Sequence, residues 1–501
     1  MSNETYKAFL ERIAEIKDLS GASACLSWDQ ETYMPPGAQE ARGNQMARIG
    51  QIIHEKFTSD EMGQLLEKLQ GDDAPEDEDA RVAVERTAWN FERQAKVPGE
   101  LVSEIARAQS ASVACWAKAR VENDFESFLP HLEKLLKLQR RYADCVKESG
   151  QSQYDALLQS YERGETAEHI EQVFSGLRDA LVPLLERIQS DGTPVTTDFL
   201  HQTYDTQAQW DFGIQVLKDM GFDFERGRQD RSAHPFTSGF HPTDVRLTTR
   251  LAAEDFGSGL FSTMHEGGHG LYDQGFLEKD WGTPLGDSIS LGVHESQSRM
   301  WENFVGRSKA FWKHYYAELQ ELFINQLGEV PLETFYRGIN EVKPSLIRVE
   351  ADEVTYSLHI ILRFEIERKL LDGALDPLQL PEVWREKMQE YLGAAPEDNR
   401  DGCMQDIHWA WGMVGYFPTY TLGNLLSAQL WETIQEQIPD IEDKIEAGSL
   451  SVLTEWLREK IHHVGMRKLA PELCESVTGR PLSAQPFIDY LNRKFSDVYE
   501  L

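Results

Sequence analysis

The sequence is poor in cysteine and has no long apolar runs. Its five cysteines are scattered through 501 residues without a Cys-x-x-Cys pair, which argues against a disulfide framework. No apolar run reaches the roughly 18 residues needed to span a membrane, and the amino terminus lacks the basic start and apolar core of a signal peptide. We therefore expect a cytoplasmic protein that does not associate with membranes.

Basic residues are also scarce relative to acidic ones. The chain has 50 Lys and Arg against 84 Asp and Glu, a formal net charge of −34. Such a surface repels nucleic acid and anionic lipids, so neither is expected as a partner, although an acidic surface can also simply favour solubility.

Helical periodicity dominates the chain. Apolar residues between Tyr6 and Ile16 share one face after a Ser2-Asn3 cap. Further helical stretches are expected at 39–70, 80–188, 255–371 and from 381 to the end. Between 221 and 250, Gly, Pro and β-branched residues replace this pattern and indicate a small sheet. We predict a mainly α fold in one unit, with a helical part at 1–220, a β insertion at 221–250 and a helical catalytic part at 251–501.

The sequence His265-Glu266-Gly267-Gly268-His269 follows the predicted sheet and contains His-Glu-x-x-His. On a helix, the two histidines are separated by about 40° of rotation and one turn of rise, so both can face one metal ion. Glu266 lies near enough to act as general base on water without being a ligand. Each glycine costs about 1 kcal/mol in a helix interior, which suggests that another segment approaches closely. A helix with two surface histidines is the alternative.

A catalytic zinc site usually has three protein ligands and an open position for water. Glu295 follows His269 at a distance that allows a second helix to return, and it would complete a two-His, one-Glu set. His294 is the competing third ligand. Because adjacent helical residues diverge by about 100°, only one of the two can face the metal, and we favour Glu295.

Several motifs together resemble the M32 metallocarboxypeptidases, also called the Taq carboxypeptidase family. Besides HEGGH and HESQS, the chain contains HPF at 234–236, DVRLT at 244–248, IRVEAD at 347–352 and GCMQDIHW at 402–409. The resemblance extends over most of the chain. It implies a helical, neurolysin-like fold with a deep groove and a homodimer. It also implies one divalent metal per chain, zinc by default with cobalt possible, and agrees with Glu295 as the third ligand.

Two arginines are candidate substrate-binding residues. A carboxypeptidase must recognise a free carboxylate, for which a guanidinium is well suited. Arg348 in IRVEAD matches the family residue given this role, and an ion pair with Glu350 or Asp352 is its structural alternative. Arg246 in DVRLT resembles the arginine that closes one end of the groove, with a salt bridge on the strand surface as its alternative.

Further candidates are expected to support the site. His408 and Asp406 either pair as acid and orienter or belong to a buried polar network beside Trp409, and we favour the supporting role. Tyr420, ahead of Tyr416, is the candidate donor to the tetrahedral oxyanion. His234 either contacts substrate or braces the sheet.

The resemblance also implies a carboxypeptidase of broad specificity that releases single amino acids from peptides with a free carboxyl terminus. Metal-activated water would attack the peptide bond, with Glu266 as general base. An oligoendopeptidase or a dipeptidyl carboxypeptidase on the same scaffold is the main alternative. A non-catalytic helical binding protein is the other.

Overall fold

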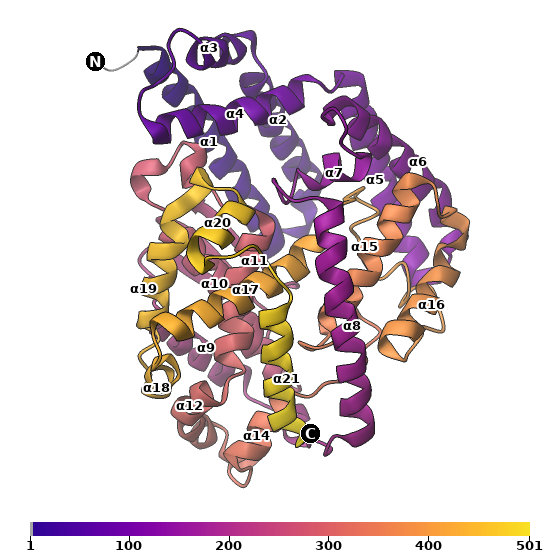
Figure 1. Cartoon of the computed structure of the whole chain (residues 1–501), viewed down its shortest axis with the longest axis vertical. Helices are drawn as coiled ribbons and strands as arrows, with labels where there is room; N and C mark the ends of the chain where they lie inside the picture. Colours follow the sequence, from indigo (N-terminus) through magenta and orange to yellow (C-terminus); the bar gives the residue numbers. More distant parts are fainter. Residues whose placement is uncertain (1–3) are drawn as a thin grey trace.

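The computed structural model describes residues 4–501, so the Ser2-Asn3 cap expected for the first helix lies outside the described residues. The amino-terminal part is helical, as predicted (Figure 1). Its helices are α1 (Glu4–Thr32), α2 (Gln39–Phe57), α3 (Asp60–Gln70), α4 (Glu78–Ala95), α5 (Gly99–Glu122), α6 (Phe125–Val146), α7 (Gln153–Leu158), α8 (Ala167–Asp191) and α9 (Thr206–Met220). The single helix expected at 39–70 is divided, because Ser59 caps α3 by accepting a hydrogen bond from the Met62 N–H.

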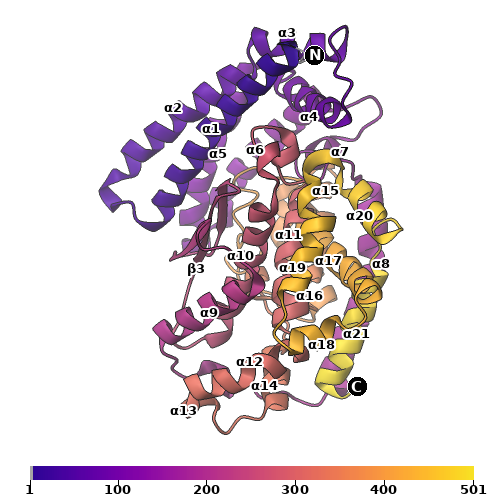
Figure 2. The ribbon, with the colours of Figure 1, turned by 90° about the vertical axis from the view of Figure 1, so that its left-hand side faces the viewer.

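A three-stranded sheet follows, within the segment where the sequence indicates one. Its strands are β1 (Gly227–Arg231), β2 (Thr237–His241) and β3 (Asp244–Thr249). β3 is central, parallel to β1 and antiparallel to β2. β2 contacts both α1 and α10, and in Figure 2 the sheet lies beneath the α1–α2 pair.

The carboxy-terminal part is again helical and contains the site. Its helices are α10 (Phe256–Gly275), α11 (Leu291–Arg299), a π-helix (Met300–Gly306), α12 (Lys309–Leu322), α13 (Ile324–Leu327), α14 (Leu332–Ile339), α15 (Tyr356–Asp372), α16 (Leu380–Leu392), α17 (Pro418–Gln437), α18 (Ile441–Glu446), α19 (Ser451–Lys460), α20 (Ala470–Thr478) and α21 (Gln485–Tyr499). The mainly α fold with a small sheet is thus confirmed. The helical stretches expected at 255–371 and beyond 381 are interrupted, most notably at 393–417, which joins α16 to α17 without a regular helix.

Two apolar cores stabilise the described chain. The larger joins residues from Val97 to Tyr499, whereas the smaller is formed by α1, α3 and α4 around Phe9, Met62 and Leu66. Among residues 4–501, no helix combines the length and the apolar character needed to cross a bilayer. All five cysteines are free thiols.

Candidate active site

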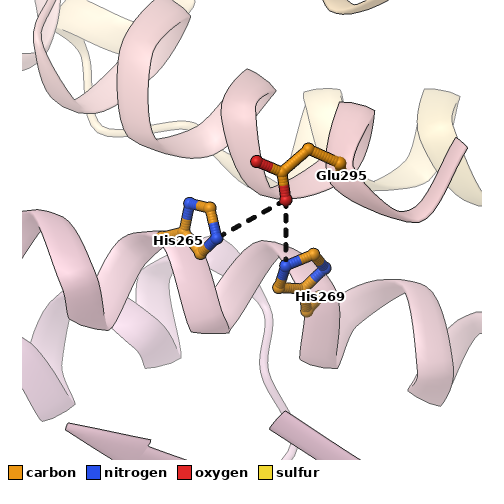
Figure 3. A group of neighbouring side chains, drawn as sticks. All are labelled: His265, His269 and Glu295. Carbon is orange, nitrogen blue, oxygen red and sulfur yellow. Dashed lines mark ion pairs between the residues drawn. The ribbon is translucent and has the colours of Figure 1, made fainter. Parts of the chain in front are cut away.

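Two neighbouring helices bring three potential metal ligands together. His265 and His269 lie on α10, and Glu295 faces them from α11 (Figure 3). The Glu295 Oε2 lies 3.7 Å from His265 Nε2 and 3.5 Å from His269 Nε2. Donor atoms from all three residues lie within 4.8 Å of one another.

The close approach of the helices depends on glycine. A side chain on Gly268 would collide with the backbone of Gln297 and Ser298 in α11. On the other side of α11, a side chain on Gly423 of α17 would meet the Glu295 side chain at 2.7 Å. The glycine in the HEGGH helix therefore allows α11 to pack against α10, and Gly423 leaves room for Glu295.

A buried carboxyl group from a distant segment fixes the start of α11. Ser290 caps this helix by accepting a hydrogen bond from the Val293 N–H at 3.1 Å. Glu162, between α7 and α8, accepts another from the Gly292 N–H at 2.5 Å. Burial raises the Glu162 pKa to about 8, although hydrogen bonds from Ser290 and Gly292 oppose this rise. Glu295 thus projects from a helix whose first turn is well anchored.

A charged network orients His265. Its Nδ1–H donates to Glu302 Oε2 at 2.9 Å, and Arg299 bridges Glu302 and Glu295 at 3.1 and 2.7 Å. Burial alone would raise the pKa of Glu302, but the charges of Arg299 and His265 lower it to about 2. Glu295 behaves similarly: Arg299 and His265 outweigh its burial and hold its pKa below the ordinary range. Both carboxyl groups are therefore ionised at neutral pH.

His269 is supported by a different kind of partner. Its Nδ1 lies 2.5 Å from Nδ1 of His294, and Nε2 of His294 lies 3.1 Å from Asp273 Oδ1. With Nε2 of His269 directed at Glu295, Nδ1–H of His269 donates to His294, whose own Nε2–H donates to Asp273. In this arrangement His294 lies behind His269.

The donor set fits a divalent cation. Ligands at about 2.0–2.1 Å around a tetrahedral zinc lie about 3.3–3.5 Å from one another, close to the spacings between Glu295 and the two histidines. Both Nδ1 atoms are engaged elsewhere, which leaves each Nε2 available for the ion. Two neutral imidazoles and one carboxylate are a typical catalytic zinc set.

Glu266 lies beside this centre and is almost fully buried. Its Oε2 accepts a hydrogen bond from the Thr237 hydroxyl at 2.7 Å. Glu266 belongs to α10 and Thr237 to β2, so the sheet holds the carboxylate of a residue on the neighbouring helix. This contact gives the β insertion a direct role in positioning the candidate base.

Arg348 belongs to a buried charge cluster. Its Nε and Nη2 donate to Asp406 Oδ1 at 3.0 and 2.8 Å, and its Nη1 donates to the Tyr356 hydroxyl at 3.0 Å. Arg363 donates to the other Asp406 oxygen at 2.7 Å. Burial would lower the pKa of Arg348, but Asp406 outweighs this and raises it. The cluster has two guanidinium groups and one carboxylate, and its excess positive charge can attract an anion.

His408 and Tyr420 border the same cluster. Nε2 of His408 lies 3.3 Å from the Tyr420 hydroxyl, and the Arg348 guanidinium lies over the Tyr420 ring at 5.0 Å. The Tyr416 ring is 5.6 Å from that of Tyr420. Asp406 bonds to both Arg348 and Arg363, whereas its Oδ1 lies 3.9 Å from Nδ1 of His408. The supporting role favoured for His408 and Asp406 stays a prediction.

Arg246 and His234 lie in the sheet region. Arg246 pairs with Asp244 of the same strand at 3.0 Å and covers the Trp28 ring at 4.4 Å. His234 is exposed in the loop before β2, where its carbonyl accepts a hydrogen bond from Ser232 at 2.5 Å. Neither joins the Arg348 cluster through the contacts described here.

Several residues of the site were not identified from the sequence. Arg299 and Glu302 lie four and seven residues after Glu295, and Asp273 lies four after His269, so helical spacing could have revealed them. Thr237 and Glu162 had no such signal, because folding brings them to the site from distant segments.

The chain is similar to known proteins over nearly its whole length. The family model described as "Carboxypeptidase Taq (M32) metallopeptidase" matches residues 8–495. The chain is 42% identical to thermostable carboxypeptidase 1 of Thermus thermophilus, with 99% of each chain covered. It is 37% identical to carboxypeptidase 1 of Bacillus subtilis over 100% of both. The crystal structure of the M32 carboxypeptidase from Deinococcus radiodurans superposes with a TM-score of 0.97 at 39% identity, covering 99% of this chain and 100% of that one.

Proposed function

The chain belongs to the carboxypeptidase Taq (M32) metallopeptidase family and is a metal-dependent carboxypeptidase. From that premise we propose that it releases single carboxy-terminal residues from peptides with broad specificity, using the centre formed by His265, His269 and Glu295. The observation that carries this proposal is the convergence of these three ligands beside a buried Glu266.

Zinc is the metal we propose for this centre, with cobalt as a functional substitute. Two imidazoles and a carboxylate suit zinc, and the second partners of both imidazoles favour the tautomers that bind a cation through Nε2. When bound, the cation lowers the pKa of water toward 7 and polarises the scissile carbonyl.

Glu266 is the proposed general base and then general acid. It takes a proton from the attacking water and returns it to the leaving amine. Thr237 restrains one carboxylate oxygen, so Glu266 needs little reorganisation for either transfer. Tyr420 is the proposed donor to the oxyanion, with Tyr416 beside it as the alternative.

Arg348 is the proposed recognition residue for the substrate carboxylate. Asp406 and Tyr356 accept three of its N–H groups, which fixes the guanidinium plane and leaves two of the five donors for the substrate. His408 helps to shape this end of the site. At the sheet end, Arg246 is proposed to limit the groove and His234 to contact substrate.

The same family membership supports a homodimer as the assembly. The free state of all five cysteines supports a cytoplasmic location. Light scattering of the purified protein would test the assembly by giving the mass of two chains rather than one.

Cleavage of matched peptides tests the proposed activity. A free-acid peptide and its carboxy-terminal amide are incubated with the protein, with a chelator, and with the chelator followed by excess zinc. We expect stepwise loss of single residues from the acid only, abolished by the chelator and restored by zinc. Internal cleavage of both peptides would instead indicate an oligoendopeptidase, and release of dipeptides a dipeptidyl carboxypeptidase.

A further inference from the structure

A cavity lies next to Asp273, beyond the metal ligands of α10. It has a volume of about 270 Å³ and is enclosed by α1, β2, the end of α10 and the segment at 281–288. Phe240, Phe276 and Trp281 form much of its wall. The His241 ring meets Trp281 nearly edge-on, with the centroids 4.7 Å apart. None of these residues has a role in the chemistry described above.

Two elements connect this cavity to the catalytic residues. On α10, Asp273 lines the cavity and lies one turn, about 6 Å, beyond His269. On β2, Gly239 lines the cavity and lies two residues, about 7 Å, beyond Thr237, the partner of Glu266. Both routes place the cavity at a similar distance from the reacting centre.

Arg348 and the cavity are connected to different ends of the HEGGH segment of α10. Arg348 bonds to Tyr356, whose ring lies 4.4 Å from the Arg299 guanidinium, and Arg299 holds the Glu302 carboxylate that orients His265. Arg348 is therefore connected through the His265 end of α10. The cavity instead adjoins Asp273, beyond the His269 end. A peptide whose terminal carboxylate reaches Arg348 consequently extends its upstream residues toward the cavity.

The lining favours a bulky apolar side chain. Three aromatic residues offer a large apolar surface to an aromatic or aliphatic group. The charges are Asp273 and Asp287, with Lys17 paired to Asp287, so an acidic side chain meets an excess of negative charge. A peptide extended alongside β2 advances about 3.3 Å per residue, so the two-residue step from Thr237 to Gly239 corresponds to two substrate residues upstream of the scissile bond.

We infer that this cavity is the subsite for the third residue from the carboxyl terminus of the substrate, and that it selects an aromatic or large aliphatic side chain there. This inference rests on the proposed carboxypeptidase activity. Trp281 is its main specificity-determining residue, because its ring is the largest aromatic group of the wall.

Three peptides that share their last two residues and carry Phe, Ala or Glu at the third position test the inference. For the wild-type protein, kcat/KM should be about tenfold higher for the Phe than for the Ala peptide, and lowest for the Glu peptide. Trp281→Ala should reduce the Phe-to-Ala ratio to near one, while Trp281→Phe should keep most of it. Ala24→Phe, which fills the cavity from α1, should also abolish the ratio.

Trp411→Ala is the matched control, because this exposed tryptophan does not line the cavity and its backbone N–H donates to the His408 carbonyl, and it should keep the wild-type ratio. Circular dichroism and metal content establish that each variant is folded. Equal cleavage of the three peptides by the wild-type protein would overturn the subsite while leaving the carboxypeptidase activity intact, and so would an unchanged ratio in Trp281→Ala. Failure to cleave any of the peptides would instead refute the proposed function itself.

Discussion

The two candidate arginines occupy very different surroundings. Arg348 is 6% exposed and bonds to Asp406, which also bonds to the buried Arg363. Arg246 lies at the sheet end, its side chain is 18% exposed, and it pairs with Asp244, whose side chain is 44% exposed. Both arginines occur in family motifs, yet only one belongs to a desolvated network.

This difference separates the arginine proposed to bind the substrate carboxylate from the arginine proposed to limit the groove. A desolvated guanidinium held by several partners is preorganised for an anion, and its loss leaves the bound charge without a partner. A partly hydrated ion pair on a strand contributes at most about 1 kcal/mol, and water can replace it. We therefore expect the two ends of the site to respond unequally to the same substitution.

Substitution of Arg348, at the buried end of the site, should have the largest effect on activity. In Arg348→Ala, the substrate carboxylate loses its charged partner, which costs about 2–5 kcal/mol and lowers kcat/KM for free-acid peptides roughly 30-fold to several thousand-fold. Arg348→Lys should recover only part of this, because an ammonium lacks the two-pronged geometry. The ratio of kcat/KM for matched acid and amide peptides measures the effect. An unchanged ratio in the alanine variant would mean that the carboxylate is recognised elsewhere.

Between the two ends, the metal centre gives an intermediate test. Glu295→Ala removes a proposed ligand and should weaken zinc binding by more than about 100-fold, whereas His294→Ala removes only the partner of His269 and should weaken it by about 10-fold to 100-fold. Titration against a competing chelator gives both affinities. Greater loss in His294→Ala would assign the third ligand to His294 instead.

Substitution of Arg246, at the sheet end of the site, should have a smaller effect on activity. Arg246→Ala removes a half-hydrated ion pair and a contact with Trp28, so we expect kcat/KM for short free-acid peptides to fall by less than about tenfold. The ratio of acid to amide cleavage should stay at its wild-type value. A fall as large as that of Arg348→Ala would contradict the contrast between the two ends.

The pH dependence of stability tests whether the Arg348 end of the site is desolvated, because His408 borders the Arg348 cluster. Burial, followed by the charges of Arg348 and Arg363, lowers the His408 pKa to about 4, although Asp406 opposes this. Between this value and about 6.5 the unfolded chain binds more protons, so the contribution of His408 is present above pH 6.5 and is lost as the pH falls toward 4. From pH 7 to 5, wild-type protein should lose about 1–2 kcal/mol more unfolding free energy than His408→Gln. Urea titrations at the two pH values measure this loss, and equal losses would contradict it.

The sequence predicts local features of the site better than long-range ones. His265 and His269 are one helical turn apart, so their common direction follows from helix geometry alone. The glycines of HEGGH suggested the close approach of another segment, and the structure places α11 against Gly268 and Leu217 of α9 against Gly267. The mainly α fold and the small sheet likewise follow from periodicity.

Contacts between distant segments could not be predicted in this way. Nothing near Thr237 indicates that its hydroxyl bonds to Glu266, and nothing near Glu162 indicates that it anchors α11. Arg348 was expected to pair with Glu350 or Asp352 if structural, but its carboxylate partner is Asp406, 58 residues away. Such pairings depend on how helices pack, which sequence spacing does not specify.

The central claim is that peptide hydrolysis depends on Glu266 beside a metal bound by His265, His269 and Glu295. Turnover of a free-acid peptide by Glu266→Gln, measured together with the metal content of the variant, tests it most directly. The amide keeps the shape of the side chain and can still meet Thr237, but it cannot accept the proton from water. We predict that kcat falls by about 100-fold or more while the metal content stays near the wild-type value. An ordinary rate in this variant, with its metal bound, would contradict the account.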